Sequence, residues 1–248
     1  MENPIYIGLS RQVALRSHMD LIANNVANMS TPGYRGQNMV FKEYVVQPEG
    51  RHESLRRHDP VSMVLDYGNY KNTESGPLKQ TGNPLDMALQ GPGYFGVRIE
   101  NEETGYTRAG NFQVNVNGEL VTSRGNYVLD EGGGIITVPA GATDIRVTSD
   151  GFVATEEGRI GRLMVREFDN LQDLQARGDG IYITEEEGIE AENTNVVQGM
   201  VEGSNVKPVL EMTRMIEVSR AYEQTQRMLE SENNRLRTMI QRLSRGSN

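Results

Sequence analysis

One long helical segment near the C-terminus places the strongest constraint on the fold. Residues 206–243 are a run of helix-forming residues, and from residue 215 the core positions advance by alternating steps of three and four. This heptad spacing is typical of a helix that keeps one face against a partner helix. The segment is therefore predicted to be half of a coiled coil. Polar Thr225 and Glu232 also fall in the seam, whose other members are Met215, Val218, Tyr222, Leu229, Leu236, Met239 and Leu243.

The N-terminal end supplies a second helical pattern, over residues 5–29. Its apolar residues step by four, three, four and three, and Ile5 and Leu9 begin the stripe upstream. Pro32 and Gly33 stop the helix, because the residue before a proline disfavours the helical conformation. Most helical stability comes from packing an apolar face, so this helix is predicted to dock on the C-terminal one. Its stripe comprises Leu15, Met19, Ile22, Val26 and Met29.

Three asparagines lie in the last turns of the N-terminal helix. Asn24, Asn25 and Asn28 are poor helix formers, and their amides can hydrogen-bond across a helix interface and fix its register. The alternative is that they are exposed polar residues at a fraying helix end. The sequence favours neither interpretation.

The centre of the chain has the pattern of an antiparallel β domain. Of the chain's 27 glycines and nine prolines, 24 glycines and six prolines lie between the helical ends, in residues 34–206. Alternating apolar residues over 112–116 precede an Asn-Gly pair at residues 117–118, which is the strongest hairpin signal in the sequence. Further turn signals follow at residues 124–126 and 150–151. Short strands with such spacing are typical of antiparallel sheets.

These patterns divide the chain into helical ends and a β centre. Residues 83–200 are assigned to a mainly antiparallel β domain, and residues 1–33 and 201–248 to the two halves of a helical domain. Residues 34–82 are predicted to be an extended connector, in which residues 39–46 form either a short strand or a helix extension. The predicted fold class is α+β.

Charge follows the same division. Residues 61–206 hold ten Lys/Arg and 23 Asp/Glu, whereas both ends are slightly basic and the whole chain carries −9. We expect the acidic centre to face water and the ends to pack together. No nucleic-acid partner is expected, because phosphate binding needs clustered Lys/Arg. The one basic cluster, within residues 51–58, is interleaved with acidic residues and is predicted to be a solvated segment rather than an anion site.

No set of residues points to catalysis, a metal or a cofactor. The chain has no cysteine, and its histidines, His18, His52 and His58, fall on a helix and in the polar connector. The glycines of residues 91–96 are interpreted as turn residues, since Pro92 removes a backbone donor and no helix follows. We expect no enzyme activity, no cofactor, no metal and no small-molecule substrate.

Neither a cleaved signal peptide nor a membrane span is expected. The first ten residues contain no basic region, and no run of about 18 apolar residues exists. Composition alone predicts a cytoplasmic protein.

Three blocks of sequence resemble the bacterial flagellar axial proteins, which are the rod, hook and hook-associated subunits. Residues 23–36 read ANNVANMSTPGYRG, and residues 202–223 read EGSNVKPVLEMTRMIEVSRAYE. The central block has two segments, GPLKQTGNPLDMALQGPGYFGV at residues 76–97 and YTRAGNFQVNVNGELVTSRGNYVL at residues 106–129. Within the family the chain is most similar to the proximal-rod proteins. The residues that carry the terminal motifs are Asn24, Asn25, Asn28, Thr31, Pro32, Gly33, Tyr34, Ser204, Asn205 and Val206.

The resemblance implies a structural subunit of the flagellar basal-body rod, the helical drive shaft that transmits torque from motor to hook. The terminal helices would form an inner, antiparallel coiled coil and the β domain an outer layer. Neighbouring subunits would bury the apolar residues beside the seam, which are Met212, Ile216, Met228 and Ile240.

The resemblance also implies partners and a location. The partners are other copies of the chain, other rod subunits and the flagellar type III export apparatus, with no membrane insertion. The expected location changes from the cytoplasm to the periplasmic rod, reached without a cleaved signal peptide.

Three other functions remain as alternatives. The nearest is a distal-rod subunit of the same family. A second is a soluble adhesin or binding module that is dimerised by its helices. The third is an enzyme such as a wall-cleaving hydrolase, with carboxylates drawn from Asp86, Asp130 or Asp169.

Overall fold

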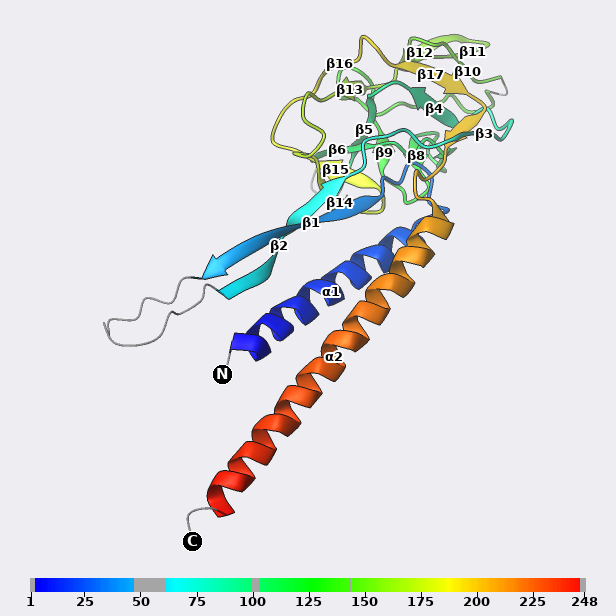
Figure 1. The fold of residues 1–248 in the computed structure, drawn as a ribbon. Helices are drawn as coiled ribbons and strands as arrows, with labels where there is room; N and C mark the ends of the chain where they lie inside the picture. The colour runs from blue at the N-terminus through cyan, green and yellow to red at the C-terminus, as the bar shows by residue number, and fades with distance from the viewer. Residues whose placement is uncertain (1–2, 47–60, 100–102, 143, 246–248) are drawn as a thin grey trace. The chain divides into compact units, whose positions relative to one another are not determined.

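The chain has the α+β fold that the sequence predicts, with one helix near each end and a central antiparallel β region (Figure 1). The computed structural model describes residues 3–46, 61–99, 103–142 and 144–245. No helix in these ranges is long and apolar enough to cross a membrane.

Two compact units make up the chain, and each is described by itself. The helical unit combines residues 1–27, 37–70 and 207–248. The β unit combines residues 28–36 and 71–206. The β unit therefore includes segments on both sides of the range 83–200 that the sequence assigns to a β domain.

Two antiparallel helices form the framework of the helical unit. α1 (Asn3–Ala27) packs along α2 (Pro208–Arg245), and the two run in opposite directions (Figure 1). Gly8 faces the side chain of Leu229, and Asn25 bonds to Glu211. Since α1 begins only a few residues before Gly8, roughly the last three turns of α2 extend past the described part of α1.

Proline begins α2 at the position where its missing N–H costs least. The Lys207 carbonyl accepts hydrogen bonds from the backbone N–H groups of Leu210 and Glu211, at 3.0 and 3.1 Å. Pro208 follows Lys207 and opens the helix, where its own N–H would have had no helical partner. Glu211 in the first turn interacts favourably with the positive end of the helix dipole.

A two-stranded sheet lies within the segment predicted to be an extended connector. β1 (Gln37–Val46) pairs with β2 (Val61–Lys71), so the segment over residues 34–82 holds regular strands, and residues 39–46 are strand rather than helix. The pairing escapes sequence reasoning because no short turn signal joins the two strands. The intervening basic cluster, with His52 and His58, lies outside the described residues.

Antiparallel pairs build the β unit. Its strands are β3 (Leu78–Gln80), β4 (Met87–Gln90), β5 (Tyr94–Arg98), β6 (Thr104–Thr107), β7 (Phe112–Val114), β8 (Leu120–Thr122), β9 (Tyr127–Val128), β10 (Arg146–Val147), β11 (Phe152–Thr155), β12 (Gly158–Arg162), β13 (Val165–Glu167), β14 (Gln175–Gly178), β15 (Ile181–Ile183), β16 (Ile189–Glu190), β17 (Asn195–Gln198) and β18 (Met200–Glu202). The largest sheet has the order β14-β15-β6-β5-β9-β8-β7, with β13 on β5 and β16 on β13. Separate small sheets are β10-β11-β12, β17-β4 and β18-β3.

Tight turns predicted from the sequence join these strands. β7 and β8 pair with Val114 opposite Leu120, around the Asn-Gly turn at residues 117–118. Gly118 has a φ of 85° and Gly125, between β8 and β9, has a φ of 91°, both in the region that glycine adopts without steric cost. The hairpin predicted at residues 117–118 and the turn predicted at residues 124–126 are both confirmed.

Apolar side chains from many of these strands form the core of the β unit. The rings of Phe95 and Phe112 pack edge to face with centroids 5.1 Å apart. Leu120 is almost fully buried beside them, whereas Val116, two residues beyond β7, is fully exposed. The other buried members of this cluster are Met87, Leu89, Val128, Ile136, Val153, Leu163 and Val196.

Leu120→Ala tests this core. We expect the free energy of unfolding of the β unit to fall by about 2–5 kcal/mol, since a buried leucine leaves a cavity when truncated. Val116→Ala, in the same hairpin but exposed, should change it by less than about 0.5 kcal/mol. Urea unfolding followed by tyrosine fluorescence measures both, and equal effects would show that the hairpin does not contribute to the core.

Candidate assembly site

The predicted seam of α2 lies on its most covered face. Val218 and Thr225 are buried. Met215, Tyr222, Leu229, Glu232, Leu236 and Met239 are half-buried, whereas most residues between them are exposed. Leu243 lies in α2, but its side chain is outside the described part of the structure. The heptad spacing thus marks the face of α2 that α1 covers, as far as α1 extends.

Polar residues in the seam have local partners. The Thr225 hydroxyl donates to the Ala221 carbonyl one turn earlier, at 2.9 Å, so no buried donor is left over. Glu232 forms an ion pair with Arg235 at 2.6 Å. Both residues are therefore compatible with a helix interface.

Small residues bring α1 close to α2. Gly8 and Ala14 are buried on α1, together with Ile22 and Asn25. Of the predicted stripe, Leu15, Met19 and Val26 are half-buried, while Met29 is exposed and follows the end of α1. Sequence reasoning missed the glycine and the alanine because an apolar pattern is weighted toward large side chains.

Asn25 supplies the polar contact of the helical pair. Its amide donates to the Gln37 carbonyl at 2.8 Å and to Glu211 at 3.2 Å, and its Oδ1 accepts from the Gln37 N–H at 3.0 Å. Glu211 is itself buried and paired with Arg214 at 2.7 Å. The interpretation of Asn25 as a register-fixing residue therefore agrees with its contacts, and one side chain links α1, β1 and α2.

His18 lies near this contact and packs edge to face on Phe41, with ring centroids 5.5 Å apart. Partial burial lowers the pKa of His18, and the charge of Arg214 lowers it further, while Glu211 opposes both. The imidazole is therefore neutral near pH 7. In the described residues, no group of three or more His, Asp and Glu side chains could hold a metal ion.

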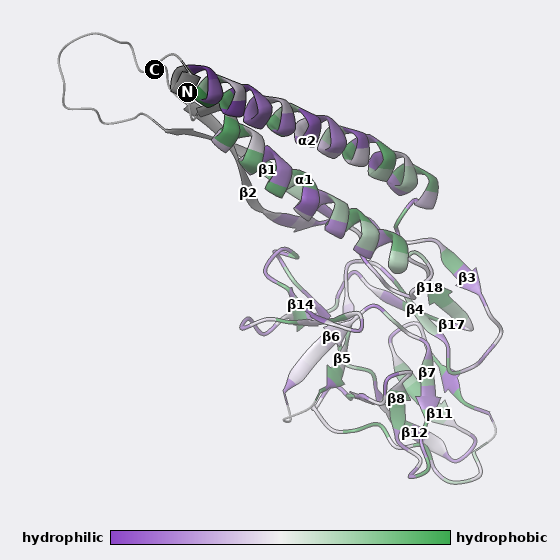
Figure 2. Ribbon diagram, turned by 90° about the horizontal axis from the view of Figure 1, so that it is seen from below, coloured by the Kyte–Doolittle hydropathy of each residue, from purple (hydrophilic) through white to green (hydrophobic). Residues whose placement is uncertain are grey.

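Apolar side chains also remain outside the helical pair. Tyr6, Leu9 and Val13 follow one face of α1 at steps of three and four, and Val13 is 59% exposed. Figure 2 shows hydrophobic residues along both helices, more densely on α1. The exposed apolar residues of α2 are Val209, Leu210, Met212, Ile216, Met228 and Ile240. These include all four residues that the sequence places beside the seam.

Residues of the N- and C-terminal motifs meet in the β unit. Gly33 has a φ of 68°, and a Cβ there would lie 2.4 Å from the backbone nitrogen of Ala109. Its N–H donates to the Glu202 carbonyl at 2.8 Å. Thr31 closes the turn after α1, bonding Asn28 through its N–H and hydroxyl at 3.1 and 3.2 Å. The motif glycine is thus required by a close approach of two backbones.

Asn205 holds the same segments together from the C-terminal side. Its Oδ1 accepts from the Gly36 N–H at 2.8 Å, and its amide donates to the carbonyls of Asn72 and Glu74 at 3.1 and 2.8 Å. The Asn205 N–H also donates to the Tyr34 carbonyl. Two further motif residues form a local turn, in which the Val206 N–H donates to the hydroxyl of buried Ser204. Pro32 is half-buried in the turn before Gly33.

A buried Arg–Glu–Arg network lies beside these motif residues. The Glu202 carboxylate bonds Nη2 of Arg35 at 3.0 Å and Nε of Arg108 at 2.8 Å. Arg108 also donates to the carbonyls of Gly91, Gly93 and Leu89. Sequence reasoning missed the network, although each of its members lies in or beside a block that carries the family resemblance. Arg108 could have been found from the sequence as a charged residue flanked by small residues within the predicted β region.

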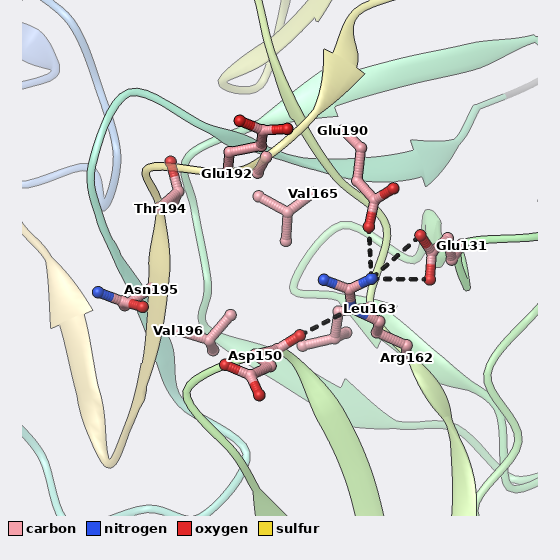
Figure 3. Close-up of a pocket in the computed structure, with 11 residues that line it drawn as sticks. Glu131, Asp150, Arg162, Leu163, Val165, Glu190, Glu192, Thr194, Asn195 and Val196 are labelled. Atoms are coloured by element: carbon pink, nitrogen blue, oxygen red, sulfur yellow. Dashed lines mark hydrogen bonds and ion pairs between the residues drawn. The ribbon is translucent and has the colours of Figure 1, made fainter.

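An acidic hollow near β12 in the β unit is held by ion pairs rather than by a catalytic arrangement. The hollow, of about 190 Å³, is lined by Glu131, Asp150, Arg162, Glu190 and Glu192 among others (Figure 3). Arg162 donates to Glu131, to Glu190 and to the Asp150 carbonyl. The hydrogen bond from Arg162 lowers the pKa of Glu190, which is opposite to the shift that a general acid needs.

The aspartates named by the hydrolase alternative have structural partners. Asp86 accepts from the Asn83 amide at 3.1 Å, and Asp130 accepts from the Gly134 N–H at 2.6 Å. Asp169 is exposed. No observation in the described residues brings the three together.

Gly33→Ala tests the motif turn against a glycine with free space. Gly125→Ala has the same positive-φ strain but nothing within 4 Å, so it should cost roughly 1–2 kcal/mol of unfolding free energy. Gly33→Ala adds a backbone collision and should cost about 1–3 kcal/mol more. Thermal unfolding of the β unit compares the two, and equal costs would contradict the close approach at Gly33.

Three protein-family profiles match the chain in sequence order. Residues 5–35 match a profile described as flagella basal body rod protein. Residues 88–155 match the flagellar hook protein FlgE/F/G D1 domain, and residues 197–242 match the C-terminal region of flagellar basal body rod FlgEFG proteins.

Curated relatives match over nearly the whole chain. The flagellar basal-body rod protein FlgF of Caulobacter vibrioides is 36% identical over 99% of both chains, and FlgF of Mesorhizobium japonicum is 35% identical over 91% of both. The flagellar basal-body rod protein FlgG of Caulobacter vibrioides is 32% identical over 94% of this chain and 96% of its own. This chain belongs to the flagellar basal-body rod protein family and is most like FlgF.

Proposed function

We propose that the chain is a structural subunit of the proximal rod of the flagellar basal body. The observation that carries the proposal is the antiparallel helical pair, which covers its seam only as far as α1 extends and leaves further apolar faces exposed on both helices. Exposed apolar stripes of this kind mark interaction surfaces in soluble proteins. Membership of the rod family supports other rod or hook subunits as the partners.

The exposed faces support a polymer rather than a closed dimer. The stripe on α1, at Tyr6, Leu9 and Val13, differs in composition from the apolar residues of α2. A contact between two different surfaces is heterologous, and its repetition builds a filament unless the rotation closes a ring. Rod assembly follows when the α1 face of one subunit packs on the α2 face of the next.

The free end of α2 has the composition of a second contact. Leu236, Met239 and Ile240 lie past the described part of α1, and Ile240 is 65% exposed. After Glu232 the helix carries arginines and no acidic residue. This end needs apolar cover that the chain's own α1 does not provide, and an adjacent subunit supplies it.

The position in the rod and the route to it complete the proposal. The similarity to the FlgF relatives supports a place in the proximal rod. The alternative is a distal-rod subunit like FlgG. The subunit reaches the periplasmic rod through the flagellar type III export apparatus, and it transmits torque without enzymatic activity. The related proteins are structural rod proteins, which supports the absence of catalysis.

Ile216→Asp tests the exposed face of α2. Ile216 is exposed in the helical pair, so the change should lower monomer stability by less than about 1 kcal/mol yet block rod incorporation. Ser231→Asp, at an exposed polar position of the same helix, is the matched control and should permit assembly. Complementation of a deletion strain, scored by motility and by basal-body composition, measures both. Normal motility with Ile216→Asp would remove this face from the interface.

Amide exchange tests the free end of α2. In dilute monomer, amides of residues 235–245 should exchange faster than those near Val218, because α1 covers only the earlier turns. Assembled rods should protect the end of α2 strongly. A closed dimer in solution, with the same protection at both ends before assembly, would instead support the soluble binding module.

A further inference from the structure

We propose that Glu202 acts as the closing residue of the β unit: Arg35 and Arg108 keep this unit from folding until the Glu202 carboxylate arrives between them. This role is independent of rod assembly. It concerns the order in which one chain folds, and it would hold even if the subunit occupied another place in the flagellum.

The geometry makes Glu202 the only described carboxylate bonded to either arginine. Its side chain is 1% exposed, and those of Arg35 and Arg108 are 5% and 0% exposed. Each carboxylate oxygen bonds one guanidinium, and Oε1 also accepts from the Gly76 N–H at 2.8 Å. Nε and Nη1 of Arg35 are buried without a hydrogen-bond partner among the described residues. The network therefore has one positive charge in excess and depends on a single carboxylate.

Burial makes this dependence severe. A buried ion pair that loses one partner leaves an uncompensated charge in a medium of low polarity, which is strongly destabilising. Without Glu202, two guanidinium groups would share a site from which water is excluded, close to the ring of Tyr94 at 5.5 Å from Arg108. Folding of the β unit around two unpaired cations is then opposed by both desolvation and repulsion.

Chain order makes Glu202 the last member to arrive. It follows Arg108 by 94 residues, and it lies on β18, whose residues 200–202 pair with β3. β17, just before it, pairs with β4 and carries Val196 into the main core. The same short C-terminal segment thus completes two sheets, the core and the charge network. A chain that is synthesised from its N-terminus contains both arginines long before Glu202 is added.

Full-length variants test the charge argument. Glu202→Gln keeps the shape and removes the charge, and it should lower the folding equilibrium constant of the β unit roughly 10²- to 10³-fold. Glu190→Gln, which weakens the exposed pair with Arg162, is the matched control and should change it less than about tenfold. Equal effects of the two changes would overturn the proposal.

Arg35→Met/Glu202→Gln separates charge from shape. This double variant restores the original net charge of the network and leaves the bonds of Arg108 to the carbonyls of Gly91, Gly93 and Leu89 in place. We expect the folding equilibrium constant of the double variant to be at least about tenfold larger than that of Glu202→Gln. If Glu202→Gln does not fold, folding of the double variant is the corresponding result. Additive losses from Arg35→Met and Glu202→Gln would mean that repulsion between the arginines is not the cause, and would overturn the proposal.

Pulse-labelled amide exchange during refolding of the full chain tests the order of events. The Gly33 and Gly76 N–H groups report on the arrival of Glu202, since both bond to it, and the Leu120 N–H reports on the core through its bond to Ile136. All three should gain protection in one kinetic phase. Protection of Leu120 in an earlier phase than Gly33 and Gly76 would show that the core folds before Glu202 docks, and the proposal would fail.

Discussion

The carboxylate of Glu202 is the contact on which the most segments of the β unit depend. It bonds Arg35 from the N-terminal motif, Arg108 from the central strands and the Gly76 N–H. The backbone carbonyl of Glu202 accepts from the Gly33 N–H. Surface ion pairs contribute little, but a buried pair strongly penalises any arrangement in which a partner is missing. The network therefore specifies which segments must meet more than it adds to stability. It gives a physical reason for three separate blocks of sequence to belong to one unit.

The helical unit depends on a different kind of contact. Its seam is a long, shallow apolar contact between α1 and α2, with one polar cluster around Asn25 and Glu211 at the end where α1 stops. Because apolar packing is not directional, the seam alone would allow the helices to slide by a turn. The Asn25 amide bonds both the Gln37 carbonyl and Glu211, and these bonds would be lost if the helices slid by a turn.

Sequence reasoning succeeds here where a feature is periodic and local. The heptad steps of residues 215–239 identify the covered face of α2, and the Asn-Gly pair at residues 117–118 identifies a hairpin, because each depends on neighbours within a few positions. Sequence reasoning does not predict the pairing of β1 with β2, because a long polar segment separates the two strands. It also misses the close contact at Gly8, because glycine has no side chain that contributes to an apolar pattern. The charge network is also out of reach, since its members are separated by up to 167 positions and only folding brings them together.

The unequal lengths of α1 and α2 have a consequence for any assembly made from this chain. The described part of α1 leaves a stretch of α2 uncovered. In the row of subunits that we propose, the next subunit would cover this stretch. The row then ends in a bare stretch on one side and in a covered pair on the other. A row of this kind would have chemically distinct ends and therefore a polarity. Neighbouring subunits would overlap along their helices. A twisting load would then act as shear along the helix interface rather than pull the subunits apart.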